Sequence, residues 1–156
     1  MAVEWITPKT DWSASYSDTG LFVGDFFNVT DYNRIKNNLL YLREMASKLI
    51  RNIPKIEVGK DKHLPDNANP DFDNDNFFAD EINLIENGLE AIDNAIPWVD
   101  FGNKQTFYEN GRFIDADELN RIEGAQLKLY NLLSNSIAGN LHLAFRLGLR
   151  ANDIRV

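Results

Sequence analysis

The chain has 156 residues, enough for one domain with a sizeable core, and its apolar and charged fractions of 44% and 26% are those of ordinary globular proteins. It contains no cysteine, which excludes disulfides, thiolate metal sites and a cysteine nucleophile. The net charge of −8 is concentrated in residues 57–95, where eleven acids face two bases, so the remaining residues sum to +1. This distribution argues against nucleic acid as a partner, because phosphate contacts need a basic face.

The sequence also argues against a membrane protein. Its first residues lack a basic leader with an apolar stretch behind it, and nowhere do about eighteen apolar residues follow one another. We therefore expect a soluble protein made in the cytoplasm.

Residues 1–25 are predicted to form an N-terminal aromatic arm, followed by a helical domain over residues 26–156. In the arm, Trp5, Trp12 and Tyr16 are separated by Thr, Ser, Asp and Gly, which favour turns and irregular structure. Two interpretations of the tryptophans are open. They cap the core of the chain itself, or they contact something outside it, which makes Trp5 and Trp12 candidates for a subunit interface.

The helical domain is organised by one phrase that occurs three times, an apolar residue, a short polar stretch with an acid, and then Asn-x-Ile at the start of a helical pattern. The repeated positions lie 50 and 87 residues after the first copy: Asn33 and Ile35, Asn83 and Ile85, and Asn120 and Ile122. The apolar spacing after each phrase predicts helices from Val29 to about Asn52, from Ala79 to about Ile96 and from Ala116 to about Leu133.

Each phrase has the chemistry of a helix start. Asn28 and Asp115 are predicted N-caps, and Asp31 and Glu118 stand where a capping box needs an acid. Phe78 stands at the cap position of the middle copy and has no acceptor, so Asn76 is an alternative cap one turn earlier.

The recurrent asparagines are not explained by helix propensity, because Asn is a mediocre helix residue. Either each Asn faces solvent in the first turn, or its amide pins the preceding loop or a neighbouring repeat. Recurrence at one position in three copies favours the pinning role.

Residues 54–76 are predicted to be a long acidic loop. Asp71, Asp73 and Asp75 have the alternate spacing of a calcium loop, but Asn76 and Ile82 stand where an EF-hand needs Gly and Glu. We expect a solvated loop, and calcium binding remains an open alternative.

The last element is predicted to be a β-strand over residues 141–149. Large apolar residues alternate there with small, basic or polar ones, which gives a strand one apolar face: Leu141, Leu143, Phe145, Leu147 and Leu149. The fold class is therefore mainly α with short β segments, built from three repeated helix units, each a loop or hairpin followed by a helix, plus a C-terminal strand. These five residues are further candidates for a subunit interface, since an exposed edge strand can join a partner's sheet.

The sequence offers little that could carry out catalysis. His63 and His142 are the only histidines, and no zinc-protease, phosphate-loop or serine-hydrolase motif occurs. A glycosidase-like carboxylate pair in the acidic loop is the remaining enzymatic alternative. We expect no enzymatic activity, no cofactor and no metal.

Two stretches carry a family resemblance. Trp5-x-x-Pro8-Lys9-Thr10-Asp11-Trp12 with the phrase from Phe27 to Leu39, and later Glu118-Leu119-Asn120-Arg121-Ile122-Glu123, resemble small tail and baseplate structural proteins of phages that infect Gram-positive bacteria. The resemblance covers about residues 1–50 and residues 104–133, and the middle copy departs from it with Leu84 in place of Arg.

The resemblance implies a virion protein of the phage tail, assembled in the host cytoplasm. Its partners would be other copies of itself and other tail or baseplate proteins, with a receptor-binding protein as one candidate. The alternative from another functional class is a carbohydrate-binding module in which Trp5, Trp12 and Trp98 stack on cell-wall sugars.

Overall fold

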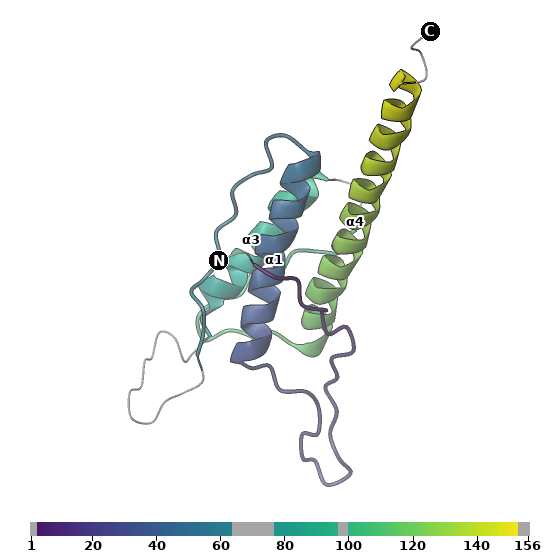
Figure 1. Cartoon of the computed structure of the whole chain (residues 1–156). Coiled ribbons are helices and arrows are strands. Elements are labelled where there is room, and N and C mark those ends of the chain that lie inside the picture. The colour runs from purple at the N-terminus through teal and green to yellow at the C-terminus, as the bar shows by residue number, and fades with distance from the viewer. Residues whose placement is uncertain (1–2, 64–76, 97–99, 153–156) are drawn as a thin grey trace.

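The computed structural model describes residues 3–63, 77–96 and 100–152, with side chains up to Gly139. Three helices account for most of this part: α1 (Val29–Leu49), α3 (Ala79–Ala95) and α4 (Ala116–Asn152) (Figure 1). The β structure in the described part consists of one antiparallel bridge between Tyr16 and Phe22. The prediction of a mainly α protein is confirmed.

The start of α1 has the predicted capping box. The Oδ1 atom of Asn28 accepts from the backbone N–H of Thr30 at 2.9 Å and of Asp31 at 3.3 Å, and the Asp31 carboxylate accepts from the Asn28 N–H at 3.1 Å. Two amide groups that a helix leaves unpaired are thereby satisfied, so α1 begins at Val29 as expected.

The other two helices begin at the predicted residues with fewer cap bonds. Asp115 accepts from the Glu118 N–H at 2.9 Å at the start of α4. At the start of α3 the cap residue is Phe78, and its backbone N–H donates to the Glu81 carboxylate at 3.3 Å. Asn76, the alternative cap, lies outside the described residues.

The ends of α1 and α3 fall close to the predicted ones. α1 ends at Leu49, three residues early, and Asn52 follows with a left-handed φ of 67° before Pro54. α3 ends at Ala95, one residue before the predicted end.

The predicted C-terminal strand, Leu141 to Leu149, is wrong. The backbone of α4 continues as a helix through Leu141, Leu143, Phe145, Leu147 and Leu149 to Asn152, well beyond the predicted end at Leu133. The reason lies in composition: residues 140–150 contain no β-branched residue and no proline, and Leu, Ala and Arg favour helix. Gly139 and Gly148 cost only about 1 kcal/mol each in a helix that is already running.

The core lies between the three helices. Each helix buries an apolar stripe at helical spacing: Tyr32, Ile35, Leu39 and Leu42 in α1, Ile82, Ile85, Leu89 and Ile92 in α3, and Leu119, Ile122, Leu129 and Leu133 in α4. The three isoleucines of the repeated phrase are all part of it. Burial of one such side chain contributes about 1.5–3 kcal/mol, so these stripes dominate stability.

The N-terminal arm belongs to the same core. Trp12 is 5% exposed within the apolar cluster, and Trp5 packs against its edge. In Figure 1 the first residues run across the bundle towards the start of α4, and a loop then projects before α1 begins. No helix in the described part is long and apolar enough to cross a membrane.

Candidate functional site

The three recurrent asparagines make the same pair of hydrogen bonds. In each, the side-chain amide donates to the backbone carbonyl of one distant residue and accepts from the N–H of that same residue, an arrangement that we call an asparagine clamp. The clamps, with the donated and accepted distances, are Asn33 with Lys62 (2.7 and 2.9 Å), Asn83 with Phe107 (2.9 and 2.8 Å) and Asn120 with Trp12 (2.9 and 2.8 Å).

The clamps follow an order along the chain. Asn33 in α1 holds Lys62, which lies between α1 and α3, and Asn83 in α3 holds Phe107, which lies between α3 and α4. Each of these helices therefore holds the segment that leads into the next one. Asn120 in α4 holds Trp12 of the N-terminal arm, so the last helix closes the arrangement on the first segment.

This geometry distinguishes the two interpretations of the asparagines. Their amides bind backbone instead of facing solvent, and they bind the segment that precedes another helix instead of the loop that precedes their own helix. A fourth clamp lies outside the repeated position, where Asn38 in α1 donates to the Ile6 carbonyl at 2.7 Å and accepts from its N–H at 3.0 Å.

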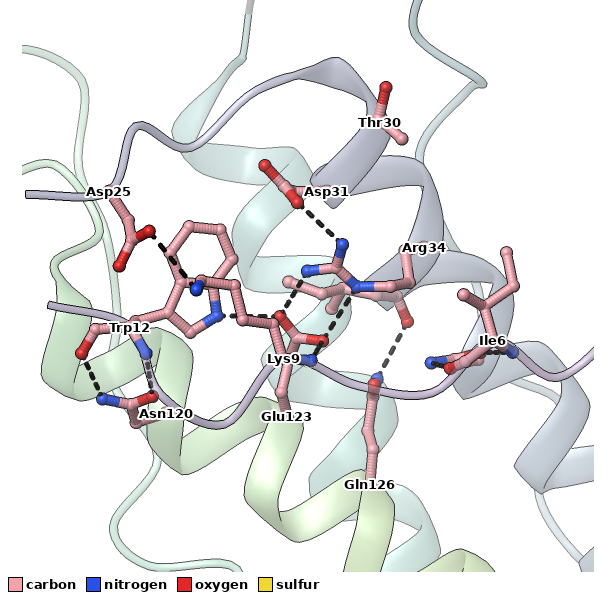
Figure 2. Close-up of polar contacts among 12 residues, drawn as sticks. Ile6, Lys9, Trp12, Asp25, Thr30, Asp31, Arg34, Asn120, Glu123 and Gln126 are labelled. Carbon is pink, nitrogen blue, oxygen red and sulfur yellow. Dashed lines mark hydrogen bonds and ion pairs between the residues drawn. The ribbon is translucent and has the colours of Figure 1, made fainter.

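The carboxylate of Glu123 joins the arm, α1 and α4 (Figure 2). It is fully buried and accepts from the backbone N–H of Lys9 at 2.8 Å, the indole Nε1 of Trp12 at 2.9 Å, and Arg34 at 3.0 and 2.7 Å. Burial lowers the pKa of Arg34, but its bonds to Glu123 and Asp31 outweigh this and hold that pKa above its usual value. The Arg34 guanidinium therefore stays charged in the interior.

A second buried ion pair joins α3 and α4. Arg121 binds Glu86, and it also binds Glu118 at 2.8 Å and the Phe101 carbonyl at 3.2 Å. Burial raises the pKa of Glu86, although Arg121 acts in the opposite direction.

The two buried acids occupy one position of the repeated phrase. Glu86 and Glu123 each stand three residues after a clamp asparagine, and Arg34 and Arg121 each directly follow one. The first copy has Lys36 at the position of the acid, and this lysine pairs with Asp61 in the next segment. Leu84 stands at the position of the arginine in the middle copy. The pair of helices that lacks the Arg–Glu bond is therefore α1 with α3, because α1 carries Lys36 in place of the acid and α3 carries Leu84 in place of the arginine.

Trp5 and Trp12, the predicted interface residues of the arm, are engaged within the chain. Trp5 stacks on Tyr130 of α4, with ring centroids 4.2 Å apart and an interplanar angle of 6°. Trp12 is buried and bonded to Glu123, so it offers no face to a sugar in this conformation. Trp98, the third residue of the carbohydrate alternative, lies outside the described residues.

Residues 13–27 form an open hairpin between the arm's anchoring residues and α1. Three backbone bonds cross it, from Asp25 N–H to the Ser13 carbonyl, from Val23 to Ser15 and from Ser17 to Leu21, at 2.7–2.9 Å. At its base the Asp25 carboxylate accepts from the Ser13 N–H at 2.8 Å, and this bond lowers the pKa of Asp25.

Exposed apolar side chains gather near the starts of the helices. Two pairs of them are 87 residues apart, Leu21 with Tyr108 and Phe26 with Phe113, and each is more than half exposed. Two cavities of about 360 and 320 Å³ share Phe113 and Ile114 in their walls. Exposed apolar side chains that lie together are a candidate contact surface.

Two further predictions concern side chains outside the described residues. The side chains of Leu141 to Leu149 are outside them, as are Asp71, Asp73 and Asp75 of the calcium alternative. In the part that the structure describes, no group of three His, Asp or Glu side chains could hold a metal ion.

The buried pair of Glu123 and Arg34 was not predicted from the sequence, although their place beside the repeated Asn was a usable signal.

Comparison with known proteins adds no relative. No family model matches the chain, and neither the curated proteins nor the solved structures give a significant match. A functional proposal therefore depends on the sequence phrases and the contacts that they make.

Proposed function

We propose that this protein is a non-enzymatic structural component of a phage tail or baseplate, which self-associates and links tail-tip or receptor-binding subunits in the virion. One observation carries the proposal: the phrases that resemble tail proteins are the ones that hold the chain together. Trp12 of the first phrase is clamped by Asn120 of the last one, and Arg34 of the second is bound by Glu123. The residues that carry the resemblance are thus bonded to one another in this fold, which supports a shared structural role for these phrases.

The architecture of the chain supports an assembly role. We propose that its three segment–helix units are copies of one building block, since each contributes a clamp asparagine followed two residues later by a buried isoleucine. A unit of this kind cannot bury its apolar stripe alone and is stable only beside others. The same requirement makes such units suited to joining subunits.

The second half of α4 supplies an attachment element. α4 has 37 residues, about 55 Å of helix, whereas α1 has 21, about 31 Å. Figure 1 shows the end of α4 extending past α1 and α3, and Leu133 is its last buried core residue among the side chains that the structure describes. A helical segment without packing partners is marginal in water, because most helical stability in proteins comes from the packing of an apolar face. We therefore place contacts with other copies, and with neighbouring tail proteins, on α4 beyond Leu133.

Mass spectrometry of purified particles tests this proposal. Tailed particles from the strain that encodes the chain would be purified on a density gradient and digested with trypsin. The expected result is that peptides of this protein rise and fall across the gradient with those of the major tail protein. Their absence from particle fractions, with the protein present in the lysate, would overturn the proposal.

A further inference from the structure

We infer that residues 3–12, the anchor segment, are exchanged between copies, so that the segment of one molecule occupies the binding surface on α1 and α4 of a second molecule. This inference rests on the proposed self-association. It goes further by naming the segment, the surface and the hinge.

The anchor segment is bound as an extended peptide ligand would be. Its backbone is held by helix side chains, through the clamps of Asn38 on Ile6 and Asn120 on Trp12 and through Glu123 on the Lys9 N–H. These helix side chains lie 32 to 114 residues away along the chain. Among the described residues, no backbone–backbone hydrogen bond joins the anchor segment to a helix, so its position depends on side chains that any copy of the chain presents.

The anchor segment differs from the other two clamped segments in its place along the chain. The other two clamped segments follow directly from the helix that holds them and are tied to it by the chain. The anchor segment precedes all three helices, and its surface is completed by the last of them. Docking onto α1 and α4 of a second copy therefore reproduces the two clamps and the Glu123 bonds that docking within one copy makes.

The open hairpin of residues 13–27 can serve as the hinge. Its two sides are held together by three backbone hydrogen bonds and by the contacts of Asp25. Its tip at Gly20 has a left-handed φ of 79°, and several of its side chains are exposed. An isolated two-stranded hairpin is marginal in water. Opened out, fifteen residues span up to about 50 Å, enough to reach an adjacent molecule.

Exchange of the anchor segment would join copies of the chain without contacts of a new kind. Because the same bonds form within and between copies, the free-energy difference between the monomer and the exchanged form depends on the hinge and on the protein concentration. Reciprocal exchange gives a closed dimer, and sequential exchange gives a ring or filament.

A disulfide across the base of the hinge tests the inference. The Ser13 Oγ and an Asp25 carboxylate oxygen lie 3.2 Å apart, so Ser13→Cys with Asp25→Cys places two thiols face to face in a chain with no other cysteine. Light scattering after size exclusion would compare the oxidised and reduced forms of the full chain over about two decades of concentration. The reduced form is expected to reach a larger molar mass as concentration rises, and the form oxidised beforehand as a dilute monomer is expected to lose that step. Equal molar masses at every concentration would overturn the inference. The same oxidant applied to Ser13→Ala with Asp25→Ala is the control.

A mixing experiment provides a second measurement that needs no disulfide. Trp12→Ala damages the anchor segment and Asn120→Ala damages its surface, so neither variant alone can form an intact site. In a mixture, the intact segment of the Asn120→Ala copy can fill the intact surface of the Trp12→Ala copy. Association through the end of α4 is the same in both variants, so the expected result is that a tag on one variant pulls down more of the other variant than of an untagged copy of itself. Equal recovery of the two would contradict exchange while leaving the presence of the protein in particles untouched.

Discussion

The guanidinium of Arg34 in α1 binds both carboxylate oxygens of Glu123 in α4, at 3.0 and 2.7 Å, and Glu123 is fully buried. The same carboxylate holds the Lys9 N–H and the Trp12 indole. One buried acid therefore links two helices to the N-terminal arm. Removing one partner of a buried pair leaves the other charge without compensation, and this cost exceeds the net value of the pair.

Glu123→Ala should accordingly lower the free energy of unfolding by about 3–5 kcal/mol in chemical denaturation. Glu109 is an exposed acid, and Glu109→Ala, the matched control, should change it by no more than about 0.5 kcal/mol. If the two variants unfold at the same denaturant concentration, the Arg34–Glu123 pair does not organise the fold.

The clamp that closes the arrangement gives a separate prediction. Asn120→Ala leaves the backbone N–H and carbonyl of Trp12 without their partner, at a cost of about 1–3 kcal/mol. Asn131 is an exposed asparagine of the same helix, and Asn131→Ala should be nearly neutral. Denaturation would measure both, and quenching of Trp fluorescence by iodide should increase for Asn120→Ala alone. Unchanged quenching would mean that the clamp does not hold the arm.

The raised pKa of Glu86 predicts that the free energy of unfolding depends on pH. Because burial raises its folded-state pKa above the usual 4.5, the folded protein binds this proton more tightly than the unfolded chain does. The contribution of Glu86 to stability is therefore most favourable in acid and declines as pH rises from 4.5 through the raised pKa. Glu86→Gln cannot titrate, so its stability relative to the native protein should increase from pH 4.5 to neutral pH in urea unfolding. A difference that is constant with pH would contradict this assignment.

Truncation after Gly139 separates folding from assembly. The described core ends with Leu133 and the partly buried Ile137, so the shortened chain should keep its free energy of unfolding within about 0.5 kcal/mol. It should lose the association that we place on the end of α4, as seen by light scattering. A shortened chain that retains the molar mass of the full protein would show that this end of α4 is not an assembly element.

The helix starts could be predicted from sequence because their signals are local. Asn28 with Asp31 and the acids at the other two starts act within one turn, so the first residue of each helix was correct. The recurrence of Asn33, Asn83 and Asn120 also indicated a pinning role. It could not show which segment each amide holds, because a clamp joins residues up to 108 positions apart.

The features that the sequence did not predict also have physical causes. The alternation from Leu141 to Leu149 is typical of a strand, but the composition of this stretch and the helix that already runs into it favour continuation of α4. The burial of Trp12 required knowledge of the Glu123 acceptor, which no periodicity reveals. Glu123 itself resembled a surface acid in sequence, since charged residues are rarely buried unless paired.

Self-association of the 156-residue chain is the central claim, and light scattering joined to size exclusion tests it most directly. The monomer has a mass of 17.9 kDa. The account predicts a molar mass above this value that increases with concentration and falls back towards it in the Asn120→Ala and truncated chains. A mass that stays at 17.9 kDa at every concentration, in all three proteins, would contradict it.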